Sequence, residues 1–283
     1  MKFTHPKADL FIPDETAAEA ALARTTHLCL AAHQDDIEIF AYHGIAECFG
    51  KGDRWFGGVV ITNGGGSARS GIYGDYTDEQ MQNVRRIEQR KAAYIGEYSF
   101  QAQLAHPSPA VKDPSNRDVV EDVKGILVNT QPEVVYLHNP ADKHDTHIGV
   151  LLKCLEAIRS LPPEQRPKRA LGCEVWRDLD WLLDSDKQAL AADQYGNIAA
   201  ALVGVFDSQI TGGKRYDLAT TGRRLANATY HNSHAVDSTQ ALTFAMDLTP
   251  LIQDDNLSLI DYTLEFIERF KQDVADRIGR FSS

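Results

Sequence analysis

The sequence lacks the features of a secreted, membrane-spanning or nucleic-acid-binding protein. Its four cysteines lie far apart and form no CxxC pair, so we expect reduced core thiols and a cytoplasmic protein rather than a disulfide framework. No stretch approaches the ~20 apolar residues of a membrane span, and the N-terminus has no apolar signal-like segment, so we expect the whole chain to be the mature protein. Lys and Arg total 29 against 40 acidic residues, a net charge of -11, which opposes binding to nucleic acid or an anionic membrane.

Several common enzyme signatures are also missing. The glycine-rich stretch GGGSARSGIYGDY, residues 64–76, has neither the GxGxxG order of a dinucleotide site nor the GK[ST] ending of a P-loop. It therefore predicts an irregular surface loop. No GxSxG elbow is present, which opposes a serine hydrolase.

What the sequence does contain is an alternation of strand and helix patterns. Apolar stretches predict strands at 27–32, 55–62, 99–104, 133–138 and 170–175. Helical patterns begin at about 36, 115 and 146, and others cover 77–97, 184–192 and 257–277. Thr77 and Gln80 predict a capping box at the start of the helix at 77–97. This alternation is typical of an α/β protein with a mostly parallel sheet flanked by helices. We expect a single domain over residues 1–283, with a motif-bearing core at about 26–210 and a C-terminal extension at about 211–283.

Two of the predicted strands end in turns that carry histidine and aspartate. The first runs into His33, Asp35 and Asp36, and the strand VVYLH runs into a turn with His144 and His147. In an open parallel sheet, ligands collect at the carboxyl ends of the strands. Two histidines and one carboxylate are the ligand set of a hydrolytic zinc site. The alternative is that one aspartate only caps the following helix.

The order of these residues carries a resemblance to a known family. AAHQDDIEI resembles the AHPDDxE signature of the PIG-L/LmbE-like metal-dependent deacetylases, and DKHDTH at 142–147 is similar to their second motif, DxHPDH. RRIEQRKAAYIGEY at 85–98, CEVWRDLDW at 173–181 and FDSQ at 206–209 are similar to further family segments in the same order. The resemblance implies a Rossmann-like fold and a zinc-dependent hydrolase that removes the acetyl group from an N-acetylglucosamine-type amino sugar or glycoside.

Carried over position by position, the resemblance makes His33, Asp36 and His147 the metal ligands. Zn²⁺ is the implied ion, with another divalent metal such as Fe²⁺ as an alternative. Asp35 falls on the family's general base, and His144 falls on the histidine that stabilises the oxyanion. Substrate contacts are suggested for Arg85, Asp142 and Gln209.

Three positions depart from the family pattern without removing a ligand. Gln34, Thr146 and Phe206 stand where the family commonly has Pro, Asp and His. We therefore expect the chemistry to be retained, while the substrate stays open.

Other residues and functions have plainer interpretations. His138 is expected to donate a hydrogen bond at a strand end, and His231 and His234, although three residues apart, are expected on a solvated helix face. An amidase of the same fold that cleaves a larger acyl amide, such as a thiol conjugate, and a non-catalytic carbohydrate-binding relative both remain as alternatives. The expected partner is a small amino-sugar substrate, and homo-oligomerisation stays open.

Overall fold

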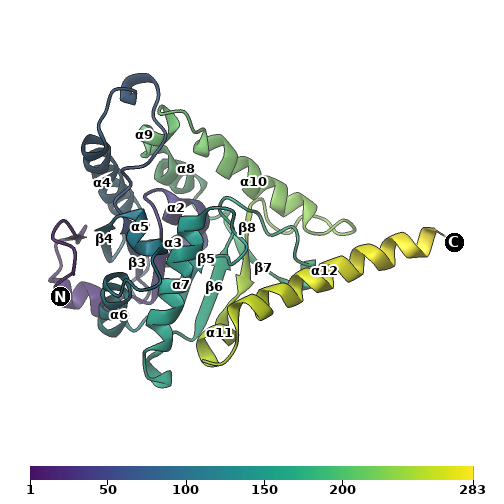
Figure 1. The fold of residues 1–283 in the computed structure, drawn as a ribbon. Helices are drawn as coiled ribbons and strands as arrows, with labels where there is room; N and C mark the ends of the chain where they lie inside the picture. The colour runs from purple at the N-terminus through teal and green to yellow at the C-terminus, as the bar shows by residue number, and fades with distance from the viewer. Residues whose placement is uncertain (283) are drawn as a thin grey trace.

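An eight-stranded sheet forms the centre of the computed structural model, which describes residues 1–282 (Figure 1). Its strand order is β1-β4-β3-β2-β5-β6-β8-β7. The strands are β1 Asp9–Phe11, β2 His27–Ala31, β3 Phe56–Thr62, β4 Phe100–His106, β5 Val134–His138, β6 Arg169–Cys173, β7 Lys187–Ala191 and β8 Leu242–Asp247. The five strands from β4 to β6 are parallel, and β1, β8 and β7 add antiparallel pairs at the two edges. The predicted α/β class with a mostly parallel sheet is confirmed.

Helices cover both faces of this sheet. The longer ones are α4 Asp78–Ile95, α6 Asp118–Thr130, α7 Asp145–Arg159, α8 Gly196–Gly204, α10 Tyr216–Tyr230 and α12 Leu259–Phe281. The shorter ones are α1 Ala18–Ala23, α2 Asp36–Phe40, α3 Tyr42–Cys48, α5 Ser108–Lys112, α9 Asp207–Ile210 and α11 Thr249–Gln253. Short 3₁₀ turns lie at Gly71–Tyr73, Pro163–Gln165 and Asp184–Asp186. Within the described chain, no helix is both long enough and apolar enough to cross a bilayer.

Alternate residues of the strands fill two separate cores. Leu30 and Leu137 pack in the core beneath α6 and α7, whereas their neighbours Cys29 and Tyr136 pack in the core beneath α2 and α3. This division follows from the two-residue period of a strand, which sends successive side chains to opposite faces. All four cysteines are buried and free.

Most of the elements predicted from the sequence are present. Each of the five predicted strands lies within two residues of its observed bounds, and the capping box at Thr77 and Gln80 caps α4. The helix expected from residue 36 is divided into α2 and α3. The prediction for 184–192 was wrong, because the segment forms a 3₁₀ turn and the edge strand β7, and β8 was not predicted. Pairing between these two strands outweighs the helical propensity of KQALA, whose residues are all good helix formers.

The topology brings the two histidine-bearing turns together. The strand β2 pairs with β3 on one side and with β5 on the other. The chain therefore adds β3 and β4 on one side of β2 and then crosses to the other side to add β5 and β6. A crevice forms at such a switch point, at the carboxyl ends of the strands. The turns after β2 and β5 both open into this crevice.

Candidate active site

The turn after β2 is held in an uncommon backbone conformation. Asp35 has a φ of 84°, which a residue with a side chain rarely adopts. Arg85 of α4 donates to the Gln34 carbonyl oxygen over 2.6 Å, and the Asp35 backbone N–H donates to Gln89 over 3.3 Å. The strain is therefore maintained by contacts from α4, as is common where a turn presents functional groups.

The turn after β5 presents its histidines from the start of α7. His144 is the N-cap residue, and its Nδ1 accepts a hydrogen bond from the Thr146 backbone N–H. His147 lies in the first turn, with its Nδ1 3.2 Å from Asp142 Oδ2. Asp142 also accepts from the backbone N–H groups of His144 and Trp176. A carboxylate in this place fixes the tautomer of a metal-binding histidine. Asp142 lines neither of the cavities described below.

Three potential ligand atoms converge between the two turns. His33 Nδ1 lies 3.2 Å from Asp36 Oδ2 and 3.2 Å from His147 Nε2, and the last two atoms are 3.3 Å apart. Ligands of a tetrahedral zinc ion, at bond lengths of about 2.0–2.1 Å, lie roughly 3.3–3.4 Å from one another. The arrangement therefore fits a metal ion of this size.

The charges around the cluster also favour a cation between the two turns. Burial lowers the pKa of His33 to about 4, which leaves a neutral imidazole. Burial by itself also lowers the pKa of His147, but the carboxylates of Asp36 and Asp142 raise it to about 9. A proton on His147 occupies the place between two carboxylates where a cation would otherwise sit.

Two neighbouring histidines lie close to these ligands. His144 Nδ1 or Nε2 is within 4.8 Å of ligand atoms of His33 and His147. His138 Nε2 accepts a hydrogen bond from the Ala32 backbone N–H over 2.9 Å, so it acts as an acceptor rather than the donor expected from the sequence. Because that nitrogen is already used, His138 supports the cluster from behind, with its ring stacked on that of His147 at 3.9 Å.

Asp35 stands beside the cluster without sharing its short contacts. Its Oδ2 accepts from Arg85 over 3.2 Å, and both side chains are buried. Burial raises the pKa of Asp35, while the Arg85 guanidinium opposes that rise. Arg85 thus has a direct contact with the predicted base and also lines the open groove.

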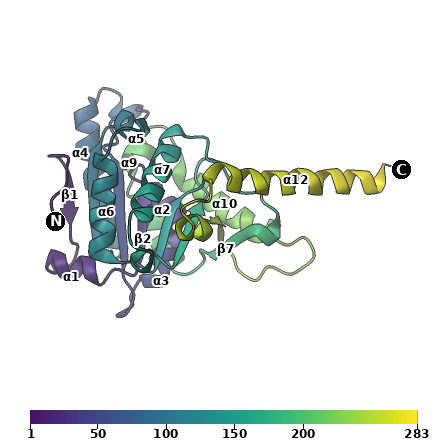
Figure 2. The same ribbon diagram turned by 60° about the horizontal axis from the view of Figure 1, so that its bottom comes forward.

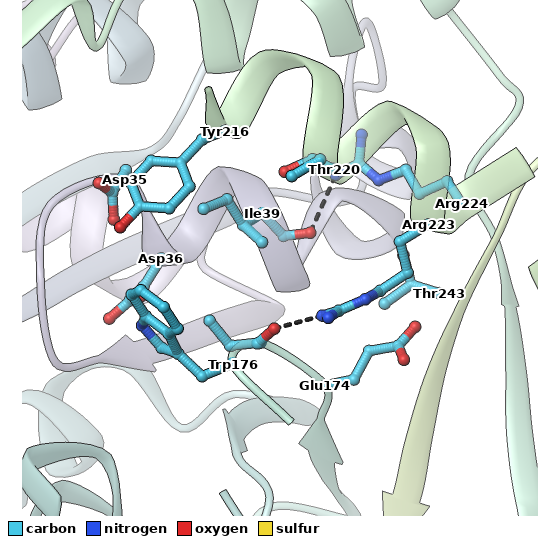
Figure 3. Close-up of a pocket in the computed structure, with 12 residues that line it drawn as sticks. Asp35, Asp36, Ile39, Glu174, Trp176, Tyr216, Thr220, Arg223, Arg224 and Thr243 are labelled. Atoms are coloured by element: carbon cyan, nitrogen blue, oxygen red, sulfur yellow. Dashed lines mark hydrogen bonds between the residues drawn. The ribbon is translucent and has the colours of Figure 1, made fainter. Parts of the chain in front are cut away.

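Two cavities meet at Asp35 and Asp36. An open groove of about 220 Å³ runs past His33, His144, the glycine loop at 64–68 and Gln209. A second cavity of about 210 Å³ lies on the other side, beneath α10 (Figure 3). The two share Trp176 and Tyr216 as walls.

The second cavity is apolar near the aspartates and polar at its far end. Ile39 lies between the aspartates and the far end, where Glu174 and Thr243 lie (Figure 3). Val175 and Ala219 also line the cavity. Most of its exposed lining is hydrocarbon, whereas polar groups make up about half of the exposed lining of the open groove.

The sequence interpretation missed three residues of the walls. Trp176 lies 6.2 Å from the ring of His144, Tyr216 lies 6.2 Å from Trp176, and Lys214 Nζ lies 5.0 Å from the Trp176 ring. Trp176 was inside a recognised segment, CEVWRDLDW, which could have marked it. Lys214 and Tyr216 carry no motif and reach the site only because α10 folds over it.

The Arg-x-x-Glu pattern in α4 positions the segment that contains Gln209. Glu88 accepts from the Ser208 backbone N–H over 2.7 Å and from its hydroxyl over 2.6 Å. Gln209 is thereby held at the open groove. Phe206 is buried in the core, so it makes no substrate-side contact in the groove, which Thr146 does line. His231 and His234 lie at the end of α10 and in the following turn rather than on a helix face.

Comparison with known families agrees with this site. Residues 28–158 match the family model PIG-L, described as GlcNAc-PI de-N-acetylase. This segment belongs to the PIG-L family. The PIG-L segment contains every residue of the ligand cluster, whereas Trp176, Lys214 and Tyr216 lie beyond it. No curated protein matches the sequence.

Solved structures share the fold of this chain at low sequence identity. The conserved protein TT1542 from Thermus thermophilus is 17% identical, with a TM-score of 0.59 over 78% of this chain and 94% of its own. The N,N'-diacetylchitobiose deacetylase of Pyrococcus horikoshii is 14% identical, with a TM-score of 0.58 over 82% and 88%. GalB, the 4-carboxy-2-hydroxymuconate hydratase of Pseudomonas putida, is 17% identical, with a TM-score of 0.60 over 79% and 95%. The fold thus accommodates both a deacetylase and a hydratase, so the reaction must be argued from the site.

Proposed function

We propose that this PIG-L protein is a zinc-dependent hydrolase that removes the acetyl group from an N-acetylglucosamine-type amino sugar or glycoside. The observation that carries the proposal is the convergence of His33, Asp36 and His147 at 3.2–3.3 Å beside the separate buried carboxylate of Asp35. Metal-dependent hydrolysis needs both parts: a ligand set with an open position and a base that is not itself a ligand.

His33, Asp36 and His147 would hold the ion, which Fe²⁺ could replace. When bound, zinc supplies a Lewis acid that polarises the amide carbonyl and lowers the pKa of a water molecule. Asp35 takes the proton of the attacking water and delivers it to the departing amine. Arg85, 3.2 Å away, keeps the carboxylate oriented toward the crevice.

His144 stabilises the carbonyl oxygen of the substrate amide as that oxygen gains negative charge. Its Nδ1 is already an acceptor for the Thr146 backbone N–H, so the proton of a neutral ring lies on Nε2. That N–H is the donor left to stabilise the oxyanion. Thr146 therefore fixes the tautomer of His144 through its backbone and needs no carboxylate to do so.

The two cavities suggest how the substrate lies. The open groove, with Gln209, Lys214 and the glycine loop, offers polar groups for sugar hydroxyls, and Trp176 and Tyr216 offer apolar ring faces. The amide would then lie at Asp35, with the acyl group directed toward the second cavity, beneath α10.

The second cavity supports the larger-acyl amidase as a second candidate function. Its volume of about 210 Å³ exceeds what an acetyl methyl group fills, and its lining includes Ile39, Val175 and Ala219. A chain of several carbons would bury more apolar surface there than acetate can.

One experiment separates these functions. The protein loaded with zinc is incubated with glucosamine carrying N-acetyl, N-butanoyl or N-hexanoyl groups, and the free amine and carboxylate released are measured. Asp35→Asn is the matched control, because it keeps the shape of the site and loses the base. Fastest release of acetate supports the deacetylase, and a preference for a longer chain supports the amidase. Binding without release from any of these amides would support the non-catalytic alternative and overturn the proposal.

A further inference from the structure

The last helix extends away from the rest of the molecule. The first turns of α12 lie on the body, where Leu259 and Tyr262 pack against the core and Phe266 is buried. The last polar contact with the body in the described residues is Arg269 to Asp186 at 3.1 Å. Beyond it, the helix continues into solvent as far as Phe281 (Figures 1 and 2).

This projecting helix is not polar on all sides. Seven large apolar side chains on α12 are exposed, between 38% and 87% of each residue's surface. They are Ile260, Leu264, Ile267, Phe270, Val274, Ile278 and Phe281. Successive members are three or four residues apart, so they form one stripe along the helix. The opposite face carries polar side chains that hydrogen-bond within the helix, including Gln272 with Asp276.

A solvated helix of this kind needs a partner. Isolated helices of about 12–15 residues are marginal in water, and among the described residues no hydrogen bond or ion pair joins the part of α12 beyond Arg269 to the body. A stripe with a three- and four-residue spacing is the seam by which helices pair in coiled coils. We propose that α12 pairs with α12 of a second copy of this chain in an antiparallel two-fold dimer.

The stripe is nearly symmetric about its own centre, which favours a second copy as the partner. Ile267 and Val274 lie three residues before and after the Phe270–Lys271 pair, and Ile260 and Phe281 lie ten residues before and after it. A two-fold axis at this pair therefore places Ile260 opposite Phe281 and Ile267 opposite Val274, while Leu264 lies one residue from the position opposite Ile278 and Phe270 lies beside the axis. A two-fold interface requires this kind of self-complementary surface.

The size of the stripe also matches a dimer interface. The stripe runs for about 33 Å at the rise of an α-helix. Seven side chains exposed to this degree offer an apolar surface comparable with the roughly 800 Å² per partner of a standard interface.

The net charge of the two bodies and the length of α12 favour an antiparallel pair of helices. Each chain carries a net charge of -11, and antiparallel helices place the two bodies at opposite ends of the seam, where they repel each other less than side by side. The free end at Phe281 then covers Ile260 near the partner's body. Lys271 is the one charged side chain on the stripe; it is paired with Glu268 of its own helix, and its hydrocarbon stem can lie along the seam.

Light scattering during size-exclusion chromatography of the full chain tests the proposal. We expect a dimer for the parent and a monomer for Val274→Glu and for Ile278→Glu, with the dimer dissociation constant raised at least 100-fold. Gln272→Glu adds the same charge on the opposite face and should remain dimeric. A circular dichroism spectrum and an amide-hydrolysis rate equal to those of the parent would show that the body is intact.

The direction of pairing has its own test. Under mild oxidation, Phe270→Cys should cross-link with itself across the axis, whereas Ile278→Cys should not, because it faces the region of Leu264 in the other copy. Cross-linking by both variants would overturn the antiparallel arrangement. Three results would overturn the dimer itself. They are a parent protein that stays monomeric at all concentrations, a dimer whose dissociation constant Val274→Glu does not change, and a parent protein that sediments with phosphatidylcholine vesicles instead of dimerising.

Discussion

Asp142 gives the sharpest test of how the metal centre is held. Its Oδ2 lies 3.2 Å from His147 Nδ1 and accepts the Trp176 backbone N–H over 3.3 Å, and its Oδ1 accepts that of His144 over 3.1 Å. Because Nδ1 of His147 donates to this carboxylate, the lone pair on Nε2 is left to face His33 and Asp36. Removing the carboxylate should therefore weaken metal binding without removing a ligand.

The size of the effect follows from these three contacts. Loss of such a supporting partner typically costs 10–100-fold in metal affinity, or about 1.4–2.7 kcal/mol. Asp142→Asn keeps one acceptor oxygen for three donors, so we expect a loss of about 10-fold. Asp142→Ala leaves all three buried donors without this partner, so we expect a loss nearer 100-fold, with a lower melting temperature as well.

Competition for zinc against a chromophoric chelator at fixed pH measures this affinity. Asp145→Asn is the control, since Asp145 lies three residues away, is exposed and makes no contact with the cluster. Unchanged zinc affinity in Asp142→Asn would refute the orienting role. If only the KM for the amino sugar rose, Asp142 would be a substrate contact, as the family resemblance suggests.

Three further changes test the remaining assignments. His147→Ala should lose most of its bound metal by elemental analysis, whereas His231→Ala should keep it; full metal in His147→Ala would contradict the ligand set. Asp35→Asn should retain metal while kcat falls by roughly 10² to 10⁴, and loss of metal in this variant would make Asp35 a ligand instead of the base. Tyr216→Leu should raise the KM for the amino sugar with little change in kcat, because Tyr216 forms a wall shared by both cavities and bears on no ligand atom; an unchanged KM would remove Tyr216 from the substrate site.

The sequence alone predicted the parallel centre of the fold and the positions of its ligand cluster. Strands β2 to β6 are buried and mostly apolar, and such segments between helical patterns are local signals that need no tertiary information. His33, Asp36 and His147 lie within a few residues of strand ends, so the rule that ligands collect at the carboxyl ends of strands was enough to bring them together. The structure added the distances of 3.2–3.3 Å between their potential ligand atoms.

Only the tertiary structure decided what surrounds that cluster. The segment KQALA forms the edge strand β7 because β8, more than fifty residues later, pairs with it. Asp142 and Arg85 were expected at the substrate; the structure places Asp142 against His147 and outside both cavities, and it places Arg85 both against Asp35 and on the open groove. The direction of a side chain depends on the packing of its whole element, which a motif does not contain. Tyr216 closes the cavities for the same reason, since the path of α10 across the crevice is set by long-range packing that is absent from any local pattern.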